Sequence, residues 1–370
     1  MIEFRDVTKR FADGTVAVDH LNLVADAGKI TVFVGPSGCG KTTSLRMVNR
    51  MIDPTSGTII VNDTDVMKTN PAKLRRGIGY VIQQAGLFPH RTVLDNIATV
   101  PLLLGWPKAK ARARAAELME LVGLSAEMAR RYPAQLSGGQ QQRVGVARAL
   151  AADPPVLLMD EPFSAVDPVV RANLQDELLR LQSELGKTIL FVTHDIDEAI
   201  KLGDKVAVLR TGGILAQYDE PGTLLAHPAD EFVEGFVGRD RGYRGLGFLS
   251  ADGLPIGELA TVPLGTPSAT AREIIGDGWA IVVDTDQRPQ GWVRVGQLAD
   301  GPVTADSLTA GGSLYDTEAG SLRGALDAAL SSPSGLGVAV DADGAVIGSV
   351  SAEDVLAVLD DARQAEIGVS

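Results

Sequence analysis

A glycine-rich segment near the N-terminus contains residue types that could bind phosphate. Residues 35–42 read Gly-Pro-Ser-Gly-Cys-Gly-Lys-Thr, which fits G-x-x-x-x-G-K-[ST] between an apolar run and a helical stretch. Its glycines would let backbone N–H groups surround an anion without a Cβ clash, and the following helix would add its positive dipole end. Lys41 would reach the β- and γ-phosphates of ATP, and the Thr42 hydroxyl would coordinate Mg²⁺. The predicted nucleotide contacts of this loop are Gly35, Pro36, Ser37, Gly38, Cys39, Gly40, Lys41, Thr42 and Thr43.

Two adjacent carboxylates follow another apolar run. Asp160 and Glu161 end the segment Val-Leu-Leu-Met-Asp-Glu at residues 156–161. Ligands of open α/β sheets bind at the carboxyl ends of strands, so the pair should face the phosphates. We expect Asp160 to hold Mg²⁺, directly or through water, and Glu161 to orient and polarise the attacking water. The alternative for this pair is two solvated acids at a strand end. The alternative for residues 35–42 is a glycine-rich turn that only caps a helix.

These groups need a sheet that brings several strand ends together. Residues 1–236 alternate short β-rich runs with helical stretches, the pattern typical of a mostly parallel sheet covered by helices. Between about residues 84 and 155 the pattern changes to helices, Lys108–Val122 and Gly139–Ala151, joined by Pro and Gly. The predicted strands are Ile2–Val7, Ile30–Val34, Ile78–Ile82, Val156–Met159, Thr188–Val192 and Val206–Leu209.

The two motifs above would fit many NTPases, and a third segment indicates which family of NTPases this chain resembles. Residues 136–140 read Leu-Ser-Gly-Gly-Gln and, with Gln-Gln-Arg directly after them, open a predicted helix ahead of the acidic strand. Glycines, a serine hydroxyl and a helix N-terminus make this a second possible anion site. Together with the two motifs above, the segment resembles the ABC ATPases over residues 1–236. The resemblance implies an α/β fold, a P-loop NTPase core of the ABC type with a helical subdomain at about residues 84–155.

The resemblance also implies roles for residues outside the first two motifs. His194 would contact the γ-phosphate and the attacking water opposite Glu161. Gln83 would take part in catalysis and metal binding and would couple ATP to the helical insertion. Gln84 is adjacent, but the register of the family favours Gln83. Phe11 would stack on adenine, and the remaining nucleotide contacts would be Ser137, Gly138, Gly139, Gln140 and Asp167.

The same resemblance implies several partners. The Ser137–Gly139 segment would serve the ATP held by a second copy, so that two copies close head-to-tail around two nucleotides. A groove near Gln83, formed in part by residues 86–93 and 101–106, would grip a helix of an integral membrane permease. A substrate-binding protein would act indirectly through that permease. The chain would then be peripheral, at the cytoplasmic face of the cell membrane.

Three short segments resemble one subgroup of these transporters. Residues 49–52, 82–90 and 143–148 look like those of importers for quaternary amines such as glycine betaine, choline and carnitine, or for proline-type solutes. The expected function is therefore ATP hydrolysis that energises such an importer. The alternatives are the ATPase of a different importer, the ATPase of an exporter, and a soluble ABC protein that acts on ribosomes or DNA.

Composition and charge limit the other possibilities. The chain has 370 residues, 45% of them hydrophobic, without an apolar run of membrane-spanning length, a signal region or more than the one Cys39. Its net charge of −13 argues against a nucleic-acid partner. Residues 1–237 carry 26 basic and 28 acidic residues, whereas residues 238–370 carry 8 basic and 19 acidic residues. This shift predicts a domain boundary.

The acidic part contains an internal repeat. Ala280–Asp286 and Gly291–Val293 recur 57 residues later as Gly337–Asp343 and Gly348–Val350. Each copy reads helix, strand, turn, strand, helix, although chance similarity of Gly and Asp turns is an alternative. The copies resemble a tandem CBS pair, with a linker at 237–247, the α/β CBS domain at 248–362 and a tail at 363–370.

The two copies differ where CBS modules often hold a nucleotide. The second copy has the hydroxyl and carboxylate of the pattern, Ser351 and Asp354, whereas the first has Arg294 and Gln297. At most one typical site is therefore expected, for a nucleotide or a cyclic dinucleotide. The alternatives for this domain are a sensor of ionic strength, a scaffold for dimers, or no role.

Overall fold

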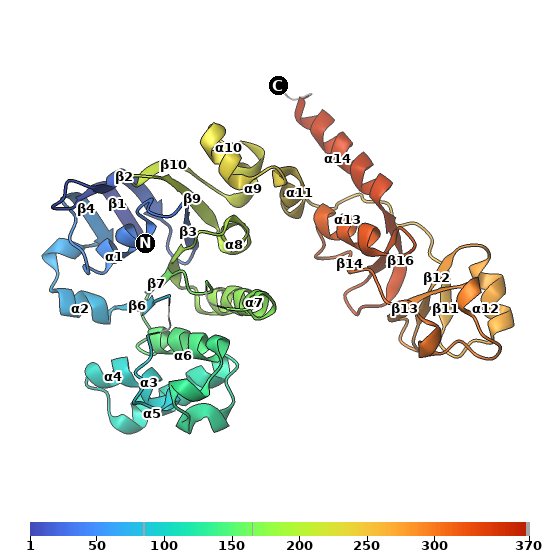
Figure 1. Ribbon diagram of the computed structural model, residues 1–370, viewed down its shortest axis with the longest axis horizontal. Helices are drawn as coiled ribbons and strands as arrows, with labels where there is room; N and C mark the ends of the chain where they lie inside the picture. Colours follow the sequence, from blue (N-terminus) through green and yellow to red (C-terminus); the bar gives the residue numbers. More distant parts are fainter. Residues whose placement is uncertain (84–85, 165, 368–370) are drawn as a thin grey trace. The chain divides into compact units, whose positions relative to one another are not determined.

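The computed structural model describes residues 1–83, 86–164 and 166–367 (Figure 1). Gln84, the alternative to Gln83, lies outside the described residues, as do residues 368–370 at the end of the predicted tail. The chain divides into two compact units, Met1–Gly238 and Arg239–Ser370. Each unit has its own hydrophobic clusters, so each is described separately below.

A six-stranded sheet forms the centre of the first unit, in the order β10-β9-β3-β8-β7-β6. Its strands are parallel except for β10, which pairs antiparallel with β9. β3, β7 and β8 are buried along their whole length, as expected for parallel strands covered on both faces. The bounds are β3 Ile30–Val34, β6 Ile78–Val81, β7 Val156–Asp160, β8 Thr188–Val192, β9 Lys205–Arg210 and β10 Ile214–Asp219.

A second, antiparallel sheet has the order β2-β1-β4-β5. The prediction that the first strand joins the parallel sheet was wrong, because β1 pairs antiparallel with both β2 and β4. The physical reason is the short turn that joins β1 to β2, since a parallel partner would need a crossover of a dozen residues or more. The bounds are β1 Ile2–Arg10, β2 Val16–Ala25, β4 Ser56–Val61 and β5 Thr64–Asp65.

Helices cover both faces of the parallel sheet and form the insertion between β6 and β7 (Figure 1). None of the described helices combines the length and hydropathy needed to cross a membrane. Outside the insertion lie α1 Lys41–Val48, η1 Val66–Lys68, α2 Pro71–Arg76, α7 Pro168–Leu185, α8 Ile196–Leu202, α9 Pro221–Ala226 and α10 Glu231–Val237. The insertion contains α3 Val93–Ile97, α4 Thr99–Leu103, α5 Lys108–Leu121, η2 Ala126–Arg130, η3 Pro133–Gln135 and α6 Gly138–Leu150.

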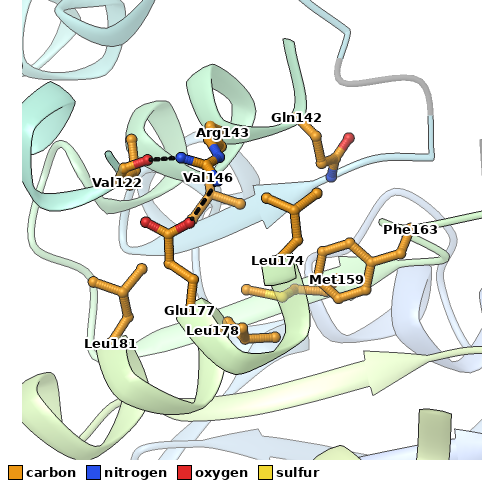
Figure 2. Close-up of a pocket in the computed structure, with 10 residues that line it drawn as sticks. All are labelled: Val122, Gln142, Arg143, Val146, Met159, Phe163, Leu174, Glu177, Leu178 and Leu181. Atoms are coloured by element: carbon orange, nitrogen blue, oxygen red, sulfur yellow. Dashed lines mark hydrogen bonds and ion pairs between the residues drawn. The ribbon is translucent and has the colours of Figure 1, made fainter. Parts of the chain in front are cut away.

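The insertion packs on the sheet through α6, which faces α7 and β7 (Figure 2). Arg143 of α6 forms an ion pair with Glu177 of α7 at 3.3 Å and donates to the carbonyl of Val122 at 3.2 Å. Met159 of β7 and Leu174 of α7 line a cavity of about 20 Å³ beneath this pair. This volume is about that needed by one water molecule, so the packing here is close.

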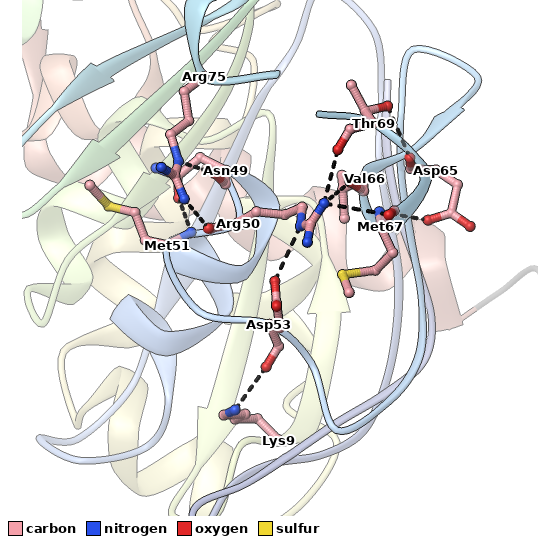
Figure 3. A network of polar contacts seen from close by, with 10 residues as sticks. All are labelled: Lys9, Asn49, Arg50, Met51, Asp53, Asp65, Val66, Met67, Thr69 and Arg75. Carbon is pink, nitrogen blue, oxygen red and sulfur yellow. Dashed lines mark hydrogen bonds and ion pairs between the residues drawn. The ribbon is translucent and has the colours of Figure 1, made fainter. Parts of the chain in front are cut away.

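The segment that follows α1 is held by two arginines (Figure 3). Arg50 donates to the carbonyl of Thr69 at 2.9 Å and to Asp53 at 3.1 Å. Arg75 of α2 donates to the carbonyl of Asn49 at 3.1 Å. These bonds satisfy carbonyl groups beyond the end of α1 and attach the phosphate-loop helix to α2.

The second unit contains two three-stranded sheets, one for each copy of the repeat, in the orders β11-β12-β13 and β14-β15-β16. Each copy begins with a short strand, absent from the prediction, that pairs parallel with the next one. The strands are β11 Thr261–Pro263, β12 Trp279–Val283, β13 Pro289–Arg294, β14 Leu314–Asp316, β15 Leu336–Val340 and β16 Val346–Ser351.

The α-helix predicted at the end of the first repeat copy is not present. Only the 3₁₀ turn η5 Val295–Gln297 follows β13, whereas α14 Ala352–Ile367 follows β16. Gly301 and Pro302 stop a helix in the first copy, because Pro lacks an N–H and restricts the residue before it. The other helices are α11 Arg241–Gly245 and η4 Leu246–Phe248, within the predicted linker and beyond it, α12 Ser268–Ile275, η6 Ala305–Ser307 and α13 Leu322–Ser331.

Candidate functional site

Three adjacent strands bring the predicted catalytic groups to one edge of the parallel sheet. β8 lies between β3 and β7, so its end separates the phosphate loop from the acidic pair. Backbone bonds continue past the strands, from Thr193 N to Phe33 O at 3.1 Å and from Glu161 N to Val192 O at 2.9 Å. The phosphate loop, the acidic pair and His194 therefore lie at the same carboxyl edge, where α/β sheets bind ligands.

Two glycines of the phosphate loop are required by close backbone contacts. A Cβ on Gly35 would lie 2.3 Å from the carbonyl oxygen of Leu209, and one on Gly40 would lie 2.1 Å from that of Ala17. Gly40 also has a φ of 90°, in the left-handed region, and directly precedes α1. Side chains at these positions would displace the loop, so the glycines maintain the turn into the helix.

Lys41 lies inside the curve of the loop. Its side chain is buried, and Nζ donates to the carbonyls of Gly35 at 2.7 Å and Pro36 at 3.1 Å. Nζ is also 3.7 Å from the Sγ of Cys39, which is fully buried. Burial raises the pKa of the Cys39 thiol, so this group stays neutral. The loop thus holds one cation ready for an anion at its centre.

Thr42 and Asp160 meet across the sheet edge. The Thr42 hydroxyl donates to Oδ1 of Asp160 at 2.8 Å, and the Asp160 side chain is buried. Burial raises the pKa of Asp160, and the hydrogen bond from Thr42 opposes that shift. A hydroxyl and a carboxylate are oxygen ligands of the kind that Mg²⁺ prefers, so the donor set fits the expected metal.

Glu161 is held beside His194 and Gln83. His194 Nδ1 lies 3.1 Å from Oε2 of Glu161, and Nε2 of Gln83 donates to the same oxygen at 3.3 Å. Glu161 has a φ of 45°, unusual for a residue with a side chain, while its backbone N–H is bonded to β8. A partly exposed carboxylate between an imidazole and an amide can accept a proton from water and orient it.

The glycine-rich start of α6 is organised by its own side chains. Ser137 Oγ accepts from Gln140 N at 3.3 Å, and Gln140 Oε1 accepts from Ser137 N at 3.0 Å, a capping box in which Gly138 is the first helical residue. A Cβ on Gly139 would lie 2.9 Å from a methyl group of Val170. Within the described residues, the hydrogen bonds of Ser137 and Gln140 remain local and do not reach the phosphate loop of the same chain.

The other predicted nucleotide contacts lie on separate elements. Phe11 follows β1, has 39% of its surface exposed, and carries Lys9 Nζ 5.3 Å above its ring. Thr43 is in the first turn of α1. Asp167 is exposed and caps α7 by accepting from Val169 N at 3.0 Å.

One polar group beside the site was absent from the prediction. The hydroxyl of Tyr80, in β6, lies 3.5 Å from Oδ2 of Asp160. Burial and the nearby Asp160 charge raise the pKa of Tyr80, so the phenol keeps its proton. The signal available in the sequence was a phenol in the strand that ends before Gln83, but only the pairing of β6 with β7 places it at the carboxylate.

In the second unit the two repeat copies show different polar arrangements. Ser351 Oγ donates to Asp354 at 2.6 Å and accepts from Asp354 N at 3.1 Å. In the first copy, Gln297 Nε2 donates to Thr309 at 2.6 Å, and Arg294 lies 5.5 Å from the centroid of the Trp279 ring. The described residues of either unit contain no group of three His, Cys, Asp or Glu side chains arranged to hold a metal.

Comparisons with known proteins decide the family. A family model described as ABC transporter matches residues 18–164. The osmoprotectant import ATP-binding protein OsmV of Salmonella typhimurium is 49% identical over 303 residues, which cover 80% of this chain and 79% of that protein. This chain belongs to the ATP-binding proteins of ABC transporters. Its first unit is accordingly an ATP-binding α/β core of the ABC type.

Other ABC ATP-binding proteins resemble this one over about two thirds of its length. The carnitine transport ATP-binding protein OpuCA of Listeria monocytogenes is 55% identical over 241 residues, or 65% of this chain. The chain spans about 60% of the length of that relative. Among solved structures, the dimeric ATP-binding cassette MJ0796 bound to ADP and Pi has a TM-score of 0.55 and 34% identity, covering 60% of this chain and 99% of that cassette.

Proposed function

We propose that this ABC ATP-binding protein hydrolyses ATP to energise an importer of quaternary-amine compatible solutes. The observation that carries the hydrolysis is the convergence of Thr42, Asp160 and Glu161 at one sheet edge, with His194 and Gln83 bonded to Glu161. Import of glycine betaine, choline, carnitine or proline-type solutes is supported by relatives named for carnitine, choline and glycine betaine transport.

The chemistry assigned to these residues is water attack on the γ-phosphate. Lys41 would hold the β- and γ-phosphates, while Thr42 and Asp160 would hold Mg²⁺, whose charge neutralises that of the phosphate oxygens when it is bound. Glu161 would orient the water and accept its proton as the water oxygen bonds to phosphorus and the bond to the ADP oxygen breaks. His194 would keep Glu161 in place and contact the γ-phosphate.

A second copy of the chain would complete the site. Ser137, Gly138, Gly139 and Gln140 form an ordered helix start whose capping bonds are local, which leaves the N–H groups of Gly138 and Gly139 and the hydroxyl proton of Ser137 for another molecule. We assign them to the nucleotide held by the second copy, with Asp167 beside them, while Phe11 of that second copy would stack on the adenine. The dimeric solved cassette supports this arrangement.

The permease would bind near Gln83, at the start of the insertion. An open groove of about 550 Å³, lined in part by Ile82, lies there, and the insertion itself exposes two apolar side chains, Phe88 and Leu103. We assign this region to a helix of the permease, which would hold the chain peripherally at the cytoplasmic face of the membrane and link it indirectly to a substrate-binding protein. The groove is lined by Arg46, Met51, Ile52, Arg75, Tyr80 and Ile82.

For the second unit we propose a regulatory tandem CBS pair over residues 248–362. The support is the duplication itself: Trp292 pairs with Thr309 and, 57 residues after Trp292, Ser349 pairs with Gly257 in the same two-bond manner. Ser351 and Asp354 are the groups that would hold the ribose or phosphate of a nucleotide or cyclic dinucleotide.

The test is transport by the assembled complex in proteoliposomes. We expect ATP-dependent uptake of at least one radiolabelled solute among glycine betaine, choline, carnitine and proline, with maltose as the control solute. The variant Glu161→Gln should bind ATP and abolish the uptake. Equal uptake of maltose would contradict the substrate class, and unchanged hydrolysis by Glu161→Gln would contradict the assignment of the base.

A further inference from the structure

Tyr80 separates the buried Asp160 from the open groove on the outside of the first unit. Its ring is one wall of that groove, together with Arg46 and Ile82, and its hydroxyl lies 3.5 Å from Oδ2 of Asp160. The other carboxylate oxygen, Oδ1, accepts from Thr42 at 2.8 Å. The two oxygens of Asp160 therefore have different partners on opposite sides.

The register of the sheet places the phenol there. Tyr80 pairs with Leu158 in the parallel ladder of β6 and β7, and Asp160 is two residues beyond Leu158 on the same strand. Side chains two residues apart share a face of a strand, so Tyr80, Leu158 and Asp160 point to the same side. Tyr80 also packs on the cluster that contains the fully buried Leu158, which restricts its ring.

The charges around the phenol favour donation to Asp160. A phenol hydroxyl can donate a hydrogen bond, and an ionised carboxylate is a strong acceptor. Arg46 lines the same groove as Tyr80 and brings a positive charge near the phenol. An aspartate held on both sides cannot rotate freely about its terminal bond.

We propose that Tyr80 is a positioning residue for Asp160: its hydroxyl holds Oδ2, so that Oδ1 and the Thr42 hydroxyl are turned together toward Mg²⁺. The inference rests on the proposed function, because it concerns the Mg²⁺ that accompanies ATP. It goes beyond that function by adding a residue of β6 to the metal site from outside the motifs that define the family.

The experiment measures binding of Mg²⁺ with a fluorescent ATP analogue, without using hydrolysis as the readout. The parent is the full chain with Glu161→Gln, titrated with the analogue in EDTA and then with MgCl₂. In Tyr80→Phe, we expect the Mg²⁺ concentration for half-maximal change to rise roughly 10-fold, the lower end of the loss for residues that orient metal ligands. The affinity for the analogue in EDTA should stay within about twofold of the parent, because the phenol does not contact the phosphate loop.

Tyr218→Phe is the matched control. Tyr218 is a partly buried tyrosine of β10 in the same sheet, and its hydroxyl donates to the carbonyl of Val24 at 2.7 Å. This variant also loses the hydrogen bonds of a phenol, the second to Thr31 Oγ1 at 3.4 Å, so it should lower stability at least as much as Tyr80→Phe does, as measured by thermal unfolding. Its Mg²⁺ dependence should equal that of the parent.

Three results would overturn the proposal, and they are distinguishable. If Tyr80→Phe and Tyr218→Phe share the parent's Mg²⁺ dependence, Tyr80 does not position Asp160, while the proposed function stands. If Tyr80→Phe lowers the affinity for the analogue equally in EDTA and in Mg²⁺, the role of Tyr80 is structural. If the parent binds the analogue without any response to Mg²⁺, both the inference and the proposed metal site fail.

Discussion

The two units of this chain assemble their polar groups in different ways. In the first unit, Thr42 and Asp160 are 118 residues apart and meet because parallel strands end at one edge. In the second unit, Ser351 and Asp354 are three residues apart, at the junction of one strand and one helix. A site built from distant strand ends needs the whole sheet, whereas a local site can change in one repeat copy and persist in the other.

The divergence of the repeat copies illustrates the second case. The backbone pairing at Trp292 and Ser349 is the same in both copies, so the duplication preserved the framework. The polar groups that follow differ. The side chains of Arg294 and Gln297 contact Trp279 and Thr309, and Gln297 bonds only to the backbone N–H of Arg294, whereas the side chains of Ser351 and Asp354 bond to each other. Chemistry in the second unit should therefore be confined to one copy.

The largest expected effect concerns Glu161 in the first unit. Glu161→Gln removes the proton acceptor and keeps the shape, so hydrolysis should fall by about 100- to 10,000-fold while ATP binding persists. Steady-state phosphate release and size-exclusion chromatography with ATP should show a slow enzyme trapped as a dimer. A variant that stays monomeric and hydrolyses ATP at the parent rate would show that the site lies elsewhere.

A somewhat smaller loss is expected at the phosphate loop. Lys41→Ala removes the buried cation and should slow hydrolysis by about 100- to 1,000-fold, the usual loss for a group that stabilises the transferred charge. It should also weaken the response to the γ-phosphate, measured as the ratio of ATP to ADP affinity. Thr43→Ala is the neighbouring control and should retain most of that ratio.

Deletion of the second unit tests whether the first unit folds and hydrolyses ATP on its own. The first unit has its own clusters on both faces of its sheet, so a chain ending at Gly238 should fold and hydrolyse ATP within about threefold of the full-length rate. What should change is the response to salt or added nucleotide, measured as the rate across a potassium chloride series. An inactive, aggregated truncation would mean that the units depend on each other for folding.

Within the second unit, the two copies should respond unequally to substitution. Ser351→Ala removes the cap of α14 and should lower the free energy of unfolding by about 1 kcal/mol. At the equivalent position of the first copy, Arg294 precedes only a 3₁₀ turn. Arg294→Ala should therefore lower the free energy of unfolding by less than about half of the loss in Ser351→Ala. Denaturant unfolding of both variants checks this, and equal losses would contradict the proposed divergence.

The smallest effect is expected on the antiparallel sheet of the first unit. His20 Nδ1 lies 2.6 Å from Asp6 Oδ1, and this hydrogen bond raises the pKa of His20. Because the folded pKa lies above the ordinary value of about 6.5, the added stability is complete below that pH and disappears as the pH rises through the raised pKa. His20→Asn, which tolerates the φ of 48°, should change the difference in melting temperature between pH 5.5 and pH 9 by about 1 °C.

Much of the first unit could be predicted because its signals are local. The phosphate loop lies between an apolar strand and a helix, and β3 Ile30–Val34 and β8 Thr188–Val192 have the predicted bounds. The helices at 108 and 139 begin within one residue of their predicted positions. Period and glycine placement are properties of neighbouring residues, which a single sequence displays directly.

Local signals could not predict the separate antiparallel sheet, which consists of β1, β2, β4 and β5. The sequence of β1 indicates a strand but not its partners, which depend on which turn follows and on which core its buried side chains enter. β2 and β4 escaped the prediction because they are buried only in part, whereas the central strands β3, β7 and β8 are continuous buried apolar runs. Strand partners are set by long-range packing, which propensity does not contain.

The amino-acid sequence by itself determined the phosphate loop, the acidic pair, the glycine-rich helix start and the repeat with its unequal copies. Only the tertiary structure decided that Thr42 and Tyr80 hold opposite oxygens of Asp160, and that Gln83 and His194 share one oxygen of Glu161. The physical reason is strand order. Motifs state which groups are present, but the distance between groups far apart in the chain depends on which strands are neighbours in the sheet.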